Sequence, residues 1–135
     1  MAAASPLLRG DGPIVHERHS VALSEWLERT GPELVASDLL RVEALRSARR
    51  HSPQAVVRVR IGLESITLLA VDAQCCELAS QLDPRVMRSL DALHLASALT
   101  LGDSLEGVIT YDDRMAQACS LLGLTVIAPT DGAAT

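Results

Sequence analysis

The chain has 135 residues, of which 48% are hydrophobic, so it is long enough and apolar enough for one domain with a sizeable core. Its formal net charge is −5, and Arg supplies all twelve of the Lys and Arg residues. Without Lys, the chain cannot be a protein kinase, a Schiff-base enzyme or a protein whose phosphate-binding loop ends in Gly-Lys-Ser/Thr. The scarcity of aromatic residues, only Trp26 and Tyr111, argues against a base-stacking platform for single-stranded nucleic acid.

The sequence divides into an arm, a domain and a tail. Residues 1–16 are rich in Gly, Pro and Ala without a clear period, which predicts a flexible arm before a domain over 17–129 and a flexible tail over 130–135. In chain order, the patterns predict helix 20–29, strand 33–36, helix 38–51, a helix that opens at Pro53, strand 66–71, helix 72–82, helix 90–101, strand 107–111, helix 112–122 and strand 125–128. Alternating strands and helices are typical of an α/β sandwich around a mostly parallel sheet.

The cysteines and the N-terminal sequence bear on the cellular compartment. Cys75, Cys76 and Cys119 are too few and too unevenly spaced for a disulfide framework, so we expect three small buried hydrophobic residues in helices. The N-terminus lacks the basic start and the unbroken apolar stretch of a secretory signal. The longest apolar runs fall far short of the roughly 18 residues that span a bilayer. We therefore expect a cytoplasmic protein without a membrane segment.

Three acidic residues occupy positions from which they could converge. Asp112 directly follows the expected strand 107–111, and Asp91 opens the helix that leads into this strand. Glu43 lies about one turn into the helix after strand 33–36. In a parallel sheet, helices begin at the carboxyl edge of the strands, where ligands bind. We therefore expect Glu43, Asp91 and Asp112 to face one crevice at that edge.

Each of these acids also has an ordinary structural interpretation. Asp is a favoured helix N-cap, which could account for Asp91 and Asp112 taken singly, and Asp38 could likewise cap the helix that bears Glu43. Glu43 by itself could be a solvated helix residue. His94 follows Asp91 by three residues on the same helical face, and although such a pair could bind zinc, we favour a core-facing or supporting histidine.

A cluster of carboxylates would need a cation. Carboxylates that share a site repel each other, and Mg²⁺ or Mn²⁺ binds oxygen ligands while it keeps several waters. Such an ion can hold a phosphodiester and help to generate a hydroxide nucleophile. We expect such an ion where the three carboxylates converge, and Asp113 either reaches this ion or caps its helix.

The segment 41–60 is strongly basic, with six Arg residues against one acid, although the whole chain is acidic. An Arg-rich strip beside an acidic crevice is suited to a phosphate backbone that approaches a metal ion. Arg41 and Arg46 are the candidates for these phosphate contacts. The alternative is a solvated helix surface that pairs with acids elsewhere in the fold.

Three acid-bearing segments resemble the PIN-domain family, in particular the VapC-type ribonuclease toxins of toxin–antitoxin pairs. They are residues 37–46, 88–99 and 108–115, in the order and separation that the family shows. The resemblance implies a three-layer sandwich around a mostly parallel sheet and a Mg²⁺-dependent (or Mn²⁺-dependent) endoribonuclease toxin. It also implies an RNA substrate, a small cognate antitoxin protein and a possible homodimer. Asp91 and Asp112 would be metal ligands, and Glu43 would be the third catalytic acid.

The N-terminus departs from the family pattern. Family members begin with a hydrophobic strand that ends in an Asp, which is a principal metal ligand. No acid occurs between Ala4 and Leu8, where this residue is expected, and the nearest one, Asp11, is flanked by Gly on both sides. The first strand is therefore expected to be either missing or divergent. The alternative function is a truncated or degenerate, inactive PIN domain that binds only proteins, as an antitoxin-binding or dimerising module. A receiver-type phosphoacceptor domain is disfavoured because it relies on a lysine.

Overall fold

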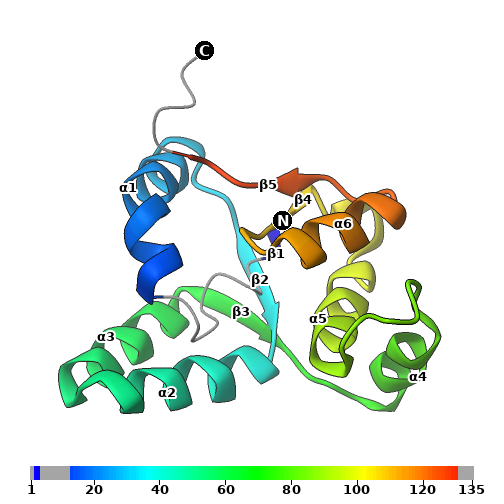
Figure 1. Cartoon of the computed structure of the whole chain (residues 1–135), viewed down its shortest axis with the longest axis horizontal. Coiled ribbons are helices and arrows are strands. Elements are labelled where there is room, and N and C mark those ends of the chain that lie inside the picture. The colour runs from blue at the N-terminus through cyan, green and yellow to red at the C-terminus, as the bar shows by residue number, and fades with distance from the viewer. Residues whose placement is uncertain (1, 4–12, 131–135) are drawn as a thin grey trace.

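The computed structural model describes residues 2–3 and 13–130, and Figure 1 shows their arrangement. The strands are β1 (Ala2–Ala3), β2 (Leu34–Ser37), β3 (Ile66–Leu69), β4 (Gly107–Ile109) and β5 (Val126–Ile127). The helices are α1 (Pro13–Thr30), α2 (Leu39–His51), α3 (Pro53–Glu64), α4 (Ala73–Gln81), α5 (Ser89–Leu99) and α6 (Asp113–Leu121), with a 3₁₀ turn at Gly102–Ser104. The expected elements between residues 33 and 128 are thus confirmed, with ends that differ by at most two residues.

The five strands form one parallel sheet in the order β3-β2-β1-β4-β5. The short strand β1 lies in the middle, where Ala3 is level with Val35 of β2 and with Val108 of β4 (Figure 1). Because all the strands are parallel, their carboxyl ends meet at one edge of the sheet. The expected α/β class with a parallel central sheet is therefore confirmed.

Helices cover both faces of the sheet, which makes three layers. Successive strand residues point to opposite faces. On β4, Val108 packs with α5 and α6, whereas Ile109 packs with Leu23 and Trp26 of α1. On β2, Ala36 packs with α2 and α3 through Leu40 and Leu63, and these helices therefore share the layer that contains α1.

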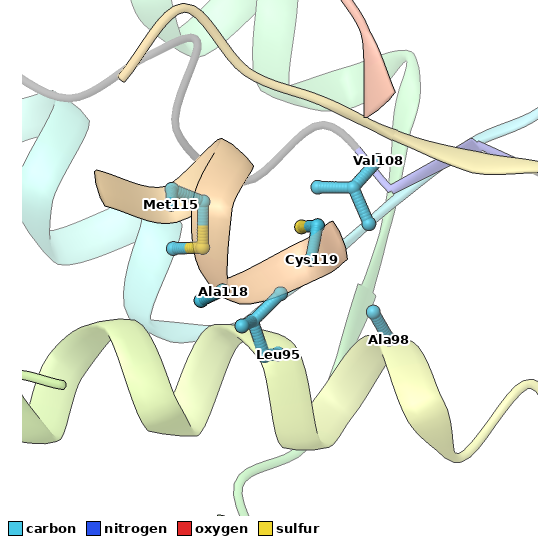
Figure 2. Packing of buried hydrophobic residues seen from close by; sticks show 6 residues of the cluster. All are labelled: Leu95, Ala98, Val108, Met115, Ala118 and Cys119. Carbon is cyan, nitrogen blue, oxygen red and sulfur yellow. The ribbon is translucent and has the colours of Figure 1, made fainter. Parts of the chain in front are cut away.

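Helix α5 is the most enclosed helix of the described chain, because it contacts the sheet, α4 and α6. Its Leu95 and Ala98 pack with Met115, Ala118 and Cys119 of α6 and with Val108 of β4, as Figure 2 shows. All six of these residues are almost fully buried. A helix that is apolar on most sides is expected to pack on several neighbours at once, as the sequence indicates here.

Local signals fix the helix ends. Ser52 accepts a hydrogen bond from the backbone N–H of Ala55, and Pro53 occupies the first turn of α3, where its missing N–H costs nothing. Asp72 caps α4 in the same way by accepting from the Cys75 N–H. Gly31 ends α1 with a positive φ of 54°, a backbone conformation that glycine adopts without steric cost.

Three expectations need correction. Helix α1 begins at Pro13, inside the stretch 1–16 that we expected to be an arm. Pro is favoured in the first helical turn, and the absence of apolar residues over 16–20 hides the helical period from the sequence pattern. The first strand is not missing but divergent, since Ala2 and Ala3 are held by pairing on both sides, which overrides their weak strand propensity. Cys76 is exposed, whereas Cys75 and Cys119 are buried as expected.

Asp38 is also not the side-chain cap that we expected. Its backbone is already helical, with φ −63° and ψ −16°, whereas a capping side chain needs an extended backbone to reach back to the first turn. Its carboxylate lies 3.4 Å from the Arg41 Nε instead. The parts of the expected arm and tail in residues 1, 4–12 and 131–135 lie outside the described residues. None of the described helices has the length and apolarity needed to cross a membrane.

Candidate active site

The three predicted acids belong to elements that meet at the carboxyl edge of the sheet. Asp112 follows the end of β4 by three residues, and Glu43 lies in the second turn of α2, just after β2. Asp91 lies in the first turn of α5. β2 and β4 flank β1 on its two sides, so the segments that follow them lie at the same edge of the sheet, where ligands of such folds bind.

A buried histidine links Glu43 to α5. His94 is only 2% exposed, and its Nε2 lies 2.5 Å from Glu43 Oε1 while its Nδ1 lies 2.9 Å from Ser37 Oγ. A carboxylate only accepts hydrogen bonds, so the Nε2–H of His94 donates to Glu43, and the Ser37 hydroxyl is the partner of Nδ1. Three segments, the end of β2, α2 and α5, are therefore tied together by one side chain. The expectation of a core-facing or supporting histidine is confirmed in that His94 is buried in the core, while a supporting role in catalysis stays a prediction.

The contact of His94 also brings Glu43 to the part of α5 that carries Asp91. Residues three apart on a helix lie on the same face. Since His94 follows Asp91 by three residues, Glu43 approaches α5 one turn from Asp91. Glu43 is thus held against α5 through His94, one turn from Asp91, while the meeting of all three acids at one ion stays a prediction.

Asp91 is a buried carboxylate, with a residue exposure of 4%. Its Oδ2 lies 3.8 Å from Arg88 Nε, and its Oδ1 is shielded from solvent. It also lines a cavity of about 400 Å³ between the start of α5 and α6. A charge removed from water is costly unless cations or hydrogen-bond donors compensate it, so this position is suited to a carboxylate that works with a cation.

Asp112 has a structural role that the sequence analysis had kept as an alternative. Its Oδ1 accepts hydrogen bonds from the backbone N–H groups of Arg114, at 2.8 Å, and Met115, at 3.1 Å, and thus caps α6. The Thr110 hydroxyl accepts from the Asp112 N–H at 3.1 Å and steadies the turn. Asp113, the first residue of α6, is exposed. The cap fixes the Asp112 carboxylate at the sheet edge.

The carboxylate ligands available at this edge suit Mg²⁺ better than a metal ion that needs three or more protein ligands. Among residues 2–3 and 13–130, no three His, Cys, Asp or Glu side chains form a group that could hold a metal ion. Mg²⁺ keeps several waters and is commonly held by one or two carboxylates together with substrate phosphates. The buried carboxylate of Asp91 suits that smaller requirement, and the assignment of Asp91 and Asp112 as ligands, with Asp113 as a third, stays a prediction.

The predicted phosphate contacts, Arg41 and Arg46, are both exposed on α2, the helix that also carries Glu43. Arg41 pairs with Asp38, as described above. Arg46 lines a shallow hollow of about 330 Å³ with Arg49 and Arg50. The basic strip is therefore a real surface feature, while its contact with RNA stays a prediction.

Sequence reasoning missed three residues at this edge: Ser37, Arg88 and Arg114. Ser37 is buried at the end of β2 and bonds to His94, and a small polar residue at the end of a predicted buried strand was its only signal. Arg88 precedes Asp91 by three residues, a spacing that brings side chains together on a helix. Arg114 lines the same cavity as Asp91, and only the fold reveals that proximity.

Comparison with known proteins agrees with this architecture. Residues 14–121 match the PIN domain family. "Ribonuclease VapC46" of Mycobacterium tuberculosis is 42% identical over 115 residues, which cover 85% of this chain and 88% of the relative. "Ribonuclease VapC35" of the same species is 37% identical over 116 residues, which cover 84% and 86%. A toxin–antitoxin complex from Klebsiella pneumoniae has a similar fold, with a TM-score of 0.61 at 19% identity over 81% of this chain and 86% of that one.

The chain therefore belongs to the PIN-domain family. Its curated relatives place it in the VapC-type branch of that family, as the three acid-bearing segments had suggested. The family match begins at residue 14 and so does not include the positions where the first acid of the family is expected.

Proposed function

We propose that the protein is the endoribonuclease toxin of a type II toxin–antitoxin system, which acts in the cytoplasm and hydrolyses RNA phosphodiester bonds with Mg²⁺ or Mn²⁺. The main support is the buried Asp91 on a helix that His94 ties to Glu43, in a chain 42% identical to a protein named a ribonuclease. Ligands of α/β proteins bind at the carboxyl edge of a parallel sheet, which is where α5 begins, with Asp91 in its first turn.

Each residue has a role in this proposal. Asp91 and Asp112 hold the divalent ion, with Asp113 as a further oxygen ligand, and the bound ion supplies charge stabilisation and a lowered pKa for water. Glu43 accepts a proton from the attacking water, and His94 holds the Glu43 carboxylate in place for this task. Arg41 and Arg46 contact phosphates of the RNA backbone from the exposed side of α2.

The proposed protein partner is a small antitoxin. The apolar residues Val42, Val57 and Ile61 of the α2–α3 pair are more than half exposed, although these helices are otherwise rich in Arg. Exposed apolar side chains on adjoining helices favour contact with another protein. The same surface could serve a homodimer, and the Klebsiella pneumoniae structure of similar fold is that of a toxin–antitoxin complex.

A second function remains a candidate because of the N-terminal sequence. None of the residues 4–8 is acidic, and without a first acid the remaining carboxylates could bind an ion too weakly for turnover. The chain would then be an inactive PIN domain that binds the antitoxin or a second copy of itself. In this case Mg²⁺ binding would be absent while antitoxin binding would persist.

RNA cleavage by the purified chain distinguishes the two functions. Wild-type protein, Asp91→Asn and the matched surface control Asp103→Asn are incubated with RNA and Mg²⁺, and the products are separated on a sequencing gel. We expect cleavage by the wild type and the control, and a loss of about a hundredfold or more in Asp91→Asn, since removal of a metal ligand costs several kcal/mol of transition-state stabilisation. No cleavage by the wild type, or equal cleavage by Asp91→Asn, would reject the nuclease assignment.

A further inference from the structure

A cavity adjoins Asp91. It has a volume of about 400 Å³ and lies between the loop before α5, the first turn of α5 and α6. Its lining consists of Pro84, Val86, Met87, Arg88, Asp91, Arg114, Met115, Gln117 and Ala118. Small-molecule sites typically occupy about 300–1,000 Å³, so the cavity, called here the α5–α6 cavity, has the size of a ligand site.

The walls of the α5–α6 cavity combine an apolar slot with two cations and one amide. Met87, Met115 and Ala118 provide the apolar part, and Met115 is fixed in the core beside Leu95. Arg88 and Arg114 contribute guanidinium groups from the two sides of the cavity. Gln117 brings a side-chain amide, which can donate and accept at once.

These features match the parts of a nucleotide. A guanidinium pair suits a phosphate, and flat apolar or guanidinium surfaces suit the face of a base when aromatic side chains are absent. Neither Trp26 nor Tyr111 lines the α5–α6 cavity, so the methionines and arginines would take that role here. An amide at the edge of the slot can read a base, and Gln pairs with adenine through two hydrogen bonds.

We infer that the α5–α6 cavity is the subsite that holds the nucleotide next to the scissile phosphate, with Gln117 as the residue that reads its base. This inference rests on the proposed ribonuclease function. The cavity shares Asp91 with the proposed metal site, so a bound nucleotide lies immediately beside the phosphate that is cleaved. Gln117 and Arg114 therefore determine specificity and binding, while Asp91 serves the chemistry.

The test uses the full chain with Mg²⁺ and a pool of RNAs of random sequence, whose cleaved ends are sequenced. Gln117→Ala and Arg114→Ala are compared with the exposed controls Gln54→Ala on α3 and Arg29→Ala on α1. We expect Gln117→Ala to lose roughly tenfold in base preference at one position beside the cut. Arg114→Ala should raise KM several-fold with kcat near that of the wild type, because it removes a phosphate contact and no reacting group. Both controls should behave as the wild type.

A parallel binding measurement separates failure of the subsite from failure of the nuclease. The anisotropy of a short fluorescent RNA reports binding without cleavage, and the two cavity variants should bind several-fold more weakly than the controls. If the wild type cleaves RNA but the cavity variants keep its base preference, KM and RNA affinity, the subsite is wrong and the nuclease stands. If the wild type does not cleave but the variants lose RNA binding, the nuclease is wrong, and the cavity binds a nucleotide without being a subsite beside a cleaved phosphate. Variants that bind RNA normally and lose only antitoxin binding would also overturn the subsite.

Discussion

The two buried faces of α5 differ in chemistry although both are closed to solvent. One face, with Leu95 and Ala98, packs against α6 and β4 through apolar contacts alone (Figure 2). The other face carries His94 and Ser97. His94 forms hydrogen bonds with Ser37 and Glu43. The Ser97 Oγ lies 3.4 Å from the Sγ of Cys75. Asp91 stands at the start of the helix, between these two faces.

The difference separates stability from positioning. Apolar burial is non-directional and contributes in proportion to the area removed from water. Buried hydrogen bonds contribute less to net stability, but they fix the direction of each side chain and are costly to break singly. We therefore expect the apolar face to determine whether the protein folds, and the polar face to determine where Glu43 lies.

The largest effect on stability is expected on the apolar face. Leu95→Ala should lower the free energy of unfolding by about 2–5 kcal/mol, because it leaves a cavity among well-packed neighbours. Denaturant unfolding followed by circular dichroism measures this change. Leu121→Ala on α6, where the side chain is 66% exposed, is the control and should cost no more than about 0.5 kcal/mol. Equal losses in the two variants would contradict the division between the faces.

A smaller loss of stability and a specific loss of catalysis are expected on the polar face. His94→Phe keeps a ring but removes both hydrogen bonds, so it should cost about 1–3 kcal/mol of stability. If His94 positions Glu43, kcat should fall roughly ten- to a hundredfold while KM stays near that of the wild type. His94→Gln should recover part of kcat because its amide can still donate to the carboxylate. An unchanged kcat in folded His94→Phe would show that the histidine only fills space.

Asp112 allows its two roles to be separated. Asn caps helices as well as Asp does, whereas Ala does not. Asp112→Ala should therefore lose about 1 kcal/mol of stability and Asp112→Asn almost none, while both should lose Mg²⁺-dependent cleavage. Thermal melting and RNA cleavage measured on the same samples provide the comparison. Full activity in Asp112→Asn would leave Asp112 as a cap alone.

The reactivity of the cysteine thiols measures their burial without any substitution in the chain. Burial raises the pKa of the Cys119 thiol from 9.0 to about 11, because the thiolate loses its hydration. Cys119 should therefore stay protonated and unreactive in the folded protein at pH 8, whereas the exposed Cys76 should be labelled. A thiol reagent followed by mass spectrometry of peptides checks this order. Labelling of Cys119 as fast as Cys76 would indicate that the contact between α5 and α6 opens readily.

Most helices and strands could be predicted from the sequence, because their hydrophobic periodicity and the Pro and Gly residues at their ends match the burial seen in the fold. The helix that carries Asp91 and the strand before Asp112 are examples. Prediction from the sequence failed where local preference and tertiary context disagree. Ala2 and Ala3 form a strand only because β2 and β4 flank them, and no local pattern reports such pairing. His94 is 51 positions from Glu43 and 57 positions from Ser37 in the sequence, so only the folded chain reveals the contacts that link them.

Metal binding tests most directly whether carboxylates from separate segments act on one ion. Titration calorimetry of the intact chain with Mg²⁺ or Mn²⁺ is compared for the wild type, Asp91→Asn and Asp112→Asn, each of which keeps its side-chain volume. We predict one ion bound by the wild type and a dissociation constant at least about tenfold higher in each variant, with folding unchanged. No binding by the wild type, or binding that neither substitution weakens, would contradict a shared metal site at this edge of the sheet.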